Sequence, residues 1–141
     1  MKNRTSATLG LLALLATTSA FGQPRQTADI PFEFRVGNTV MPAGQCEARQ
    51  SAYGVPNELI LKCWAGKGVV AVSILTQKVG RYEARNEAKL VFHKYGGTYF
   101  LSAVWPASGV GSALPISKSE RETTLRAALT STSEVVLLAR R

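Results

Sequence analysis

The side chains that could carry out covalent or acid–base chemistry are few: one histidine, His93, one aspartate, Asp29, and two cysteines. A Ser-His-Asp triad needs a histidine base, a carboxylate that orients it, and a nucleophilic serine on a sharp turn. His93 and Asp29 could fill two of these roles, but Asp29 comes just before a predicted strand and no serine lies in such a turn. We therefore predict that the protein is not an enzyme and has no catalytic residues.

Metal and cofactor sites are not indicated either. A zinc site needs three or four ligands of suitable type, and His93 with two cysteines that we expect to be paired does not provide them. Gly66-Lys67-Gly68 is typical of a hairpin turn rather than of a phosphate-cradling loop. Paired carboxylates for glycoside hydrolysis could come from several glutamates, but no spacing marks a pair. The candidates are Glu33, Glu47, Glu58, Glu83 and Glu87.

Residues 1–22 have the three parts of a secretory signal peptide. Two basic residues within the first four positions precede a short apolar run, residues 9–16, and small residues follow at 17–20. The apolar run is shorter than the about 20 residues that a membrane-spanning helix needs. We predict cleavage after Ala20 or Gly22 and export to the periplasm or the medium. An uncleaved membrane anchor is the less favoured alternative.

The charge balance of the chain is basic, and this bears on its partners. There are 17 Lys and Arg residues against nine Asp and Glu, a net charge of +8, which falls to +6 without Lys2 and Arg4. A basic protein favours anionic partners, so we expect an unknown protein or envelope component, with anionic ones favoured. Nucleic acid is disfavoured, because an exported chain rarely meets it and the cations are scattered. No later apolar run has membrane length, so we expect no transmembrane segment after processing.

The two cysteines are predicted to form a disulfide, because export would place them where disulfides persist. Cys46 and Cys63 both fall in predicted strands, and a count of two permits one connectivity. A bridge would close a loop of about 18 residues and contribute about 3 kcal/mol. Two buried free thiols are the alternative.

The elements that would position these groups are short and mostly extended. Residues 23–28 are predicted to be a disordered lead-in, and a single β-rich domain is expected over 29–141. In residues 30–36 apolar and polar side chains alternate strictly, which indicates a half-buried antiparallel strand. Residues 69–75 are apolar on both faces and are therefore expected in the centre of a sheet. Other predicted strands cover residues 45–51, 59–64 and 135–139, and residues 77–88 are expected to be an exposed loop.

The clearest local signal is a β-hairpin around Gly96-Gly97, because a two-residue turn needs positive φ at both positions. The predicted pairs are Tyr95 with Thr98, His93 with Phe100, Phe92 with Leu101 and Leu90 with Ala103. The predicted core face holds Leu90, Phe92, Leu101, Ala103 and Trp105.

The opposite face of this hairpin is unusually aromatic, and we treat His93, Tyr95 and Phe100 as a candidate binding face, with Trp64 as a further candidate. His93 could donate a hydrogen bond to a ligand there. The favoured alternative is that a short helix covers the face. A capping box with Ser117 at the N-cap and Glu120 at the third helical position predicts that helix to about residue 129. Its apolar side chains Leu125 and Leu129 would need an apolar surface to pack against, and this face would provide one.

About seven strands and one short C-terminal helix before the last strand predict a mainly β protein, either a small antiparallel β-barrel or a sandwich. Three segments also carry a resemblance: residues 31–37 followed by Met41-Pro42-Ala43-Gly44, residues 90–101 with Trp105, and residues 114–122. They resemble a group of small exported proteins abundant in acidobacteria-type soil bacteria. The likeness covers nearly the whole predicted mature chain.

This resemblance implies export and a β-rich fold, and it carries over neither an activity nor a catalytic residue. In that group the residue after Pro-Ala-Gly-x is usually a tyrosine, whereas this chain has Cys46. The departure favours a local bridge between Cys46 and Cys63 that is particular to this sequence.

The leading hypothesis is an exported, non-enzymatic envelope or secreted domain that acts by binding or structure. One alternative is a small β-barrel that carries an apolar small molecule. Another is a secreted inhibitor of a hydrolase, which rests on fold-level analogy. A wide apolar cavity would favour the carrier, and a filled interior with a protruding, ordered loop would favour the inhibitor.

Overall fold

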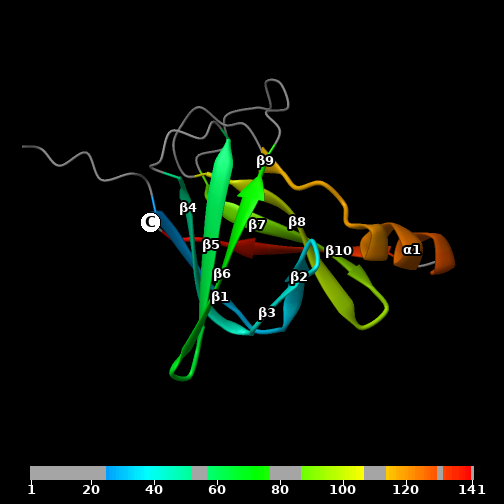
Figure 1. The fold of residues 1–141 in the computed structure, drawn as a ribbon, viewed down its shortest axis with the longest axis horizontal. Helices are drawn as coiled ribbons and strands as arrows, with labels where there is room; N and C mark the ends of the chain where they lie inside the picture. Colours follow the sequence, from blue (N-terminus) through cyan, green and yellow to red (C-terminus); the bar gives the residue numbers. More distant parts are fainter. Residues whose placement is uncertain (1–24, 52–56, 77–86, 107–113, 130–131, 141) are drawn as a thin grey trace, which may run out of the picture.

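The structure is a computed structural model, and it describes residues 25–51, 57–76, 87–106, 114–129 and 132–140. The predicted signal peptide and most of the loop predicted over residues 77–88 lie outside these residues. Within them the chain is mainly β-sheet with one short helix before the last strand, as the sequence predicted (Figure 1).

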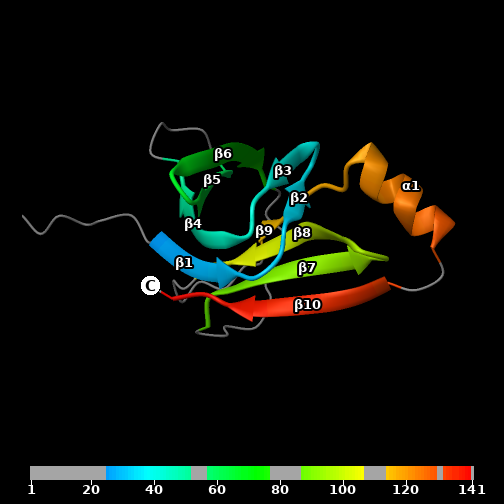
Figure 2. The same ribbon diagram turned by 90° about the horizontal axis from the view of Figure 1, so that it is seen from below.

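The strands form two sheets that pack face to face (Figures 1 and 2). The first sheet has the order β1-β4-β5-β6 and the second has the order β10-β7-β8-β2-β3, with β9 paired to β8. The first sheet contains β1 (Arg25–Ile30), β4 (Gly44–Gln50), β5 (Glu58–Ala65) and β6 (Gly68–Leu75). The second contains β2 (Phe34–Val36), β3 (Thr39–Met41), β7 (Lys89–Tyr95), β8 (Thr98–Trp105), β9 (Leu114–Pro115) and β10 (Thr132–Leu138). Helix α1 (Glu120–Ala128) connects β9 to β10.

The sheets form a sandwich rather than a closed barrel. Within the described residues they are joined by single bridges, Thr27 with Arg140 and Thr76 with Ile116, and not by a continuous ladder. Among the described strands, every pair is antiparallel except β2 with β8, which run parallel. The sequence left barrel and sandwich open, because local patterns of alternation are the same in both.

The core fills the space between the two sheets. Phe92 packs edge-to-face against both Phe32 and Phe34, with ring centroids 5.2 Å apart in each pair. Such edge-to-face aromatic pairs are favourable beyond the area that they bury. Met41 and Leu61, from opposite sheets, are fully buried in the same cluster. The interior is thus occupied by the protein's own side chains.

The prediction of a disordered lead-in over residues 23–28 is wrong for residues 25–28, which belong to β1. Strand β1 pairs with β4 along its whole length, with Ala28 opposite Cys46. Its inward side chains include Gln26, a polar residue that is nevertheless buried. This polar residue hides the period of two that would otherwise have revealed the strand.

Residues 30–36 do not form one strand, although their inward side chains alternate as predicted. Ile30 is the last residue of β1, and β2 begins at Phe34 in the other sheet. The chain crosses between the sheets at residues 31–33, where Pro31 has no amide to donate to a ladder. Ile30, Phe34 and Val36 all point into the core.

The prediction that residues 69–75 lie in the centre of a sheet is also wrong. Strand β6 is at the end of the first sheet's order, and Val69 and Leu75 are 54% and 69% exposed. A run that is apolar on both faces does not show which strands flank it. Ile74, on the inward face, is buried as expected.

The β7–β8 hairpin has the predicted register near its turn and a different one farther away. Tyr95 lies opposite Thr98, and the next two predicted pairs are also correct, but a β-bulge between Val91 and Phe92 shifts the register. Leu90 therefore pairs with Val104 instead of Ala103, and Val104 takes the fully buried core position. A bulge adds one residue to one strand, and nothing in the local sequence pattern marks it.

Helix α1 begins two residues later than predicted. Its N-cap is Ser119, whose hydroxyl accepts a hydrogen bond of 3.2 Å from the backbone N–H of Glu122. The sequence contains two overlapping Ser-x-x-Glu boxes, and the second is used because it places Glu122 against the sheet. In the part of the chain that the structure describes, no helix is long and apolar enough to cross a membrane.

The predicted disulfide between Cys46 and Cys63 is present. The two residues lie directly opposite each other on β4 and β5, with Cα atoms 4.1 Å apart, and both side chains are buried. The bond ties together the two central strands of the first sheet.

We expect Gly44→Ala to be strongly destabilising. Gly44 has φ +139°, and a Cβ added there would lie 2.5 Å from the carbonyl oxygen of Trp64 on the neighbouring strand. Steric overlap and backbone strain together should lower the free energy of unfolding by about 3 kcal/mol. Chemical denaturation measures this change.

The matched control is Gly37→Ala, because Gly37 also has positive φ, +58°, but has open space where a Cβ would go. It should lose only about 1 kcal/mol from backbone strain. Equal losses in the two variants would contradict this account of the β4–β5 contact.

Candidate functional site

The three candidate residues of the hairpin come together on one face, as expected from the register. His93 lies opposite Phe100, and the ring centroids of Tyr95 and Phe100 are 5.8 Å apart. Tyr95 and Phe100 are buried, and His93 is partly exposed. Trp64 lies on β5 in the other sheet and does not join them.

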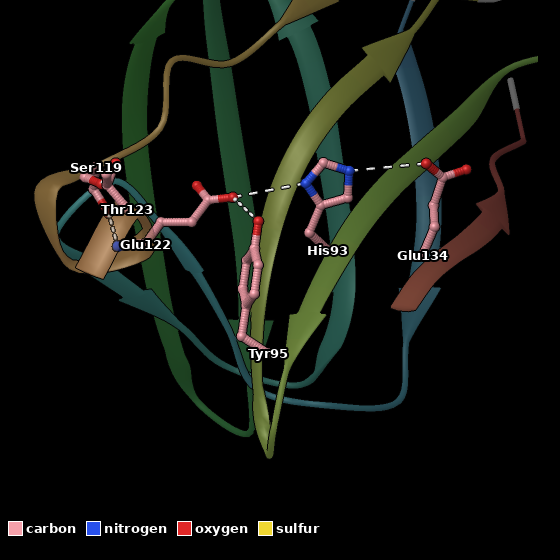
Figure 3. A network of polar contacts seen from close by, with 6 residues as sticks. All are labelled: His93, Tyr95, Ser119, Glu122, Thr123 and Glu134. Atoms are coloured by element: carbon pink, nitrogen blue, oxygen red, sulfur yellow. Dashed lines mark hydrogen bonds and ion pairs between the residues drawn. The ribbon is translucent and has the colours of Figure 1, made fainter. Parts of the chain in front are cut away.

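Helix α1 approaches this face through one carboxylate. Glu122 is the only buried residue of the helix, with 4% of its surface exposed. Its Oε1 accepts a hydrogen bond of 3.1 Å from the phenolic hydroxyl of Tyr95. Figure 3 shows Glu122 pointing from α1 toward Tyr95 and His93. Leu129, just after the helix, lies near the hairpin turn, about 3.5 Å from where a Cβ on Gly96 would be.

His93 lies between two carboxylates from different elements. Its Nδ1 is 3.7 Å from Oε1 of Glu122, and its Nε2 is 3.8 Å from Oε2 of Glu134 on β10 (Figure 3). Both distances are longer than a hydrogen bond. Nδ1 is buried and forms no hydrogen bond within the described residues. The imidazole thus lies among α1, β7 and β10 with a carboxylate on either side.

The pKa of Tyr95 is raised above its ordinary value of 10.0. Burial of the phenol is the main cause, the hydrogen bond to Glu122 and the charge of Glu122 add to it, and the charge of Arg126 opposes it. Both burial and a nearby negative charge disfavour the phenolate. Tyr95 therefore acts as a hydrogen-bond donor to the helix and not as a base.

The two described residues that the sequence offered for a catalytic triad, Asp29 and His93, lie in different sheets and do not come together. Asp29 lies on β1 opposite Gln45, whereas the carboxylates next to His93 come from α1 and β10. Glu47 faces Lys62 across β4 and β5. Among the described residues, no group of three His, Cys, Asp or Glu side chains could hold a metal ion.

Glu58, another of the candidate carboxylates, is held by hydroxyl groups. Hydrogen bonds from Ser51 and Ser73 hold the pKa of its carboxyl below the usual value of 4.5. It therefore stays ionised at neutral pH, as a surface hydrogen-bond acceptor. Glu83 lies outside the described residues.

Beside the helix lies a cleft that sequence reasoning missed. It has a volume of about 540 Å³ and opens between α1 and the β2–β3 hairpin, which lie on the same side of β7 and β8 in Figure 2. A second cleft, of about 260 Å³, lies between β2 and the tip of the β7–β8 hairpin. The larger cleft is lined by Arg35, Asn38, Glu120, Arg121, Thr124 and Leu125.

Two side chains, Arg35 and Arg121, line both clefts, so the clefts adjoin at these arginines. Arg35 lies between the buried residues Phe34 and Val36 and therefore points away from the core. Arg121 lies in the first turn of α1, next to Glu122. No signal in the sequence could have joined these positions, because their proximity depends on how α1 docks. We call the two adjoining clefts the helix-side cleft.

Comparisons with protein-family models, with curated proteins and with solved structures give no match for this chain. Its function is therefore argued from the geometry of the site.

We expect Tyr95→Phe to lower the free energy of unfolding at neutral pH. As pH rises into the alkaline range, the free energy of unfolding should fall less in this variant than in the wild type. A raised pKa in the folded state means that folding favours the protonated phenol. The contribution is complete below pH 10, the ordinary pKa, and is lost as pH rises through the folded-state pKa. Loss of the hydrogen bond to Glu122 should cost about 1 to 2 kcal/mol at pH 8.

Urea denaturation of both proteins between about pH 8 and pH 11 measures this difference. Tyr99→Phe, on the same hairpin, is the matched control, because it removes a hydroxyl from a partly buried ring that stacks on Phe32 at 3.8 Å and packs against the core cluster. A stability difference between Tyr95→Phe and wild type that stays constant across this range would contradict the prediction.

Proposed function

We propose that the protein is an exported domain that acts by binding, without turnover, and that it binds its partner in the helix-side cleft. The observation that carries this proposal is the way α1 is attached. The helix is docked through the buried Glu122, and its flank, with Arg121 and Thr124, faces an open cleft of about 540 Å³.

The side chains that line the cleft are suited to recognition. Guanidinium, amide and hydroxyl groups come from Arg35, Asn38 and Thr124, and Leu125 adds an apolar surface. A few polar groups beside an apolar surface are typical of a binding site. His93 is turned toward Glu122 and Glu134, and it does not line the cleft.

Export is supported by the N-terminal pattern of residues 1–22 and by the disulfide between Cys46 and Cys63, a bond that persists in oxidising compartments. The same reasoning favours the periplasm or the medium as the place of action. The resemblance to small exported proteins of soil bacteria points the same way.

Of the alternatives, the carrier is disfavoured because side chains such as Phe34 and Phe92 occupy the space between the sheets. The hydrolase inhibitor is the second candidate. It is supported by the β5–β6 hairpin, which extends beyond the rest of the first sheet in Figure 1 and exposes Trp64 and Val69.

We expect Thr124→Trp to abolish partner binding, because the indole fills the cleft. The protein, purified from the envelope and immobilised, would be incubated with envelope extract of its own cells, and retained components would be compared by mass spectrometry. Thr123→Trp is the matched control. Both threonines are exposed on α1 and bond through their hydroxyls to the carbonyl four residues earlier, but Thr123 does not line the cleft.

The expected result is a component that wild type and Thr123→Trp retain and Thr124→Trp loses. Equal retention by both variants would place binding elsewhere, with the β5–β6 hairpin as the next region to test. Absence of turnover is checked by a screen of esterase, peptidase, glycosidase and phosphatase substrates. Turnover that vanishes in His93→Ala while its melting temperature holds would overturn the non-enzymatic proposal.

A further inference from the structure

Arg35 and Arg121 are brought together from β2 and α1, and within the described residues neither forms an ion pair. Both line the larger and the smaller part of the helix-side cleft. An arginine side chain presents five N–H donors in a planar fork that matches the oxygens of phosphate or carboxylate groups. Two such forks at one junction can hold a single anion from two sides.

Two acidic side chains also lie near this junction, and they limit what can bind. Glu33 lines only the smaller part of the cleft and Glu120 only the larger part. Their charges oppose any anion, so a ligand must gain its affinity from direct charge-assisted hydrogen bonds to the two arginines. The three acceptor oxygens of a phosphate monoester can form more of these bonds than the two of a carboxylate. A phosphate monoester carries about −1.5 to −2 charges at neutral pH, more than a carboxylate.

The junction also has an apolar and aromatic side. In the smaller part of the cleft, the rings of Phe32 and Tyr99 stack with centroids 3.8 Å apart. In the larger part, the partly buried Leu125 contributes an aliphatic surface. A ligand whose anionic group sits between the arginines can therefore place a flat or apolar body against one of these walls.

We propose that Arg35 and Arg121 form a binding site for a phosphate monoester group attached to an apolar or aromatic body. This rests on the proposed function, because it names the ligand chemistry of the same cleft. Both the headgroup of phosphatidic acid and a soluble phosphate monoester carry this group, and the experiment separates the two sources.

The test titrates protein purified from the envelope with phenyl phosphate by calorimetry, and with vesicles of phosphatidylcholine that contain phosphatidic acid by sedimentation. Arg35→Gln and Arg121→Gln should each weaken binding at least about tenfold, the loss expected for removal of a charge-assisted hydrogen-bonding partner. Glu120→Gln should strengthen it, because it removes an opposing charge. Benzoate, a monoanion with the same ring, should bind more weakly than phenyl phosphate.

Arg126→Gln is the matched control, since Arg126 is exposed on the same helix but does not line the cleft. Arg35 is partly buried, so its variant is used only if its melting temperature is retained, and Arg121, which is exposed, provides the test that does not depend on packing. Binding of phenyl phosphate alone would identify a soluble ester as the ligand type, and binding of the vesicles alone would identify a lipid headgroup.

Saturable binding to neither probe, or equal binding by wild type and Arg121→Gln, would overturn the phosphate site. If that happens while Thr124→Trp still loses its envelope component, the proposed binding function stands with a different ligand chemistry. If the phosphate probes fail in this way and Thr124→Trp also retains the same envelope components as the wild type, both proposals are overturned.

Discussion

The buried carboxylate of Glu122 is the contact on which the placement of the helix depends. Burying a carboxylate is costly unless it is hydrogen-bonded or paired, and here one oxygen accepts the hydrogen bond of Tyr95 and faces His93. A surface helix usually docks through an apolar stripe. Helix α1 instead buries Glu122 alone, so the position of the helix is set by a few directional polar contacts.

The helix-side cleft follows from this mode of docking. Because Glu122 is fixed against Tyr95, the rotation of the helix about its axis is fixed as well. Residues three and four apart share a face of a helix, so Arg121 and Thr124 lie together on a flank beside that of Glu122. Leu125, four residues from Arg121 and three from Glu122, lies between this flank and that of Glu122. That flank faces Arg35 on β2. The anion-binding geometry that we propose is therefore a consequence of where one carboxylate is buried.

The sequence predicted those parts of the fold that local signals control. Gly96-Gly97 determined the hairpin register as far as Phe92, and the alternation around Phe34 identified the inward side chains. The disulfide was predicted from the chemistry of export and a single possible pairing. The hairpin register and the inward side chains depend on residues that are close in sequence, and the disulfide has only two cysteines to join.

The remaining features depend on contacts between distant segments. The apolar run of β6 resembles a central strand. Only the order of the strands shows that β6 lies at the end of the first sheet as described. The choice between two overlapping capping boxes depends on Tyr95, more than 20 residues earlier. The cleft itself needs Arg35 and Arg121 in one place, and no local periodicity relates them.

The role of Glu122 in docking α1 is tested most directly by amide hydrogen exchange in α1, followed by NMR, in wild type and in Glu122→Ala. A nine-residue helix is marginal in water on its own, so protection of its amides reports docking against the sheet. If Glu122 holds the helix, the amides of Thr123 and Leu129, which are hydrogen-bonded in the helix, lose their protection in Glu122→Ala while those of the β7–β8 hairpin keep theirs. Unchanged protection of α1 in this variant would show that something other than the carboxylate of Glu122 holds the helix in place, and would contradict the account.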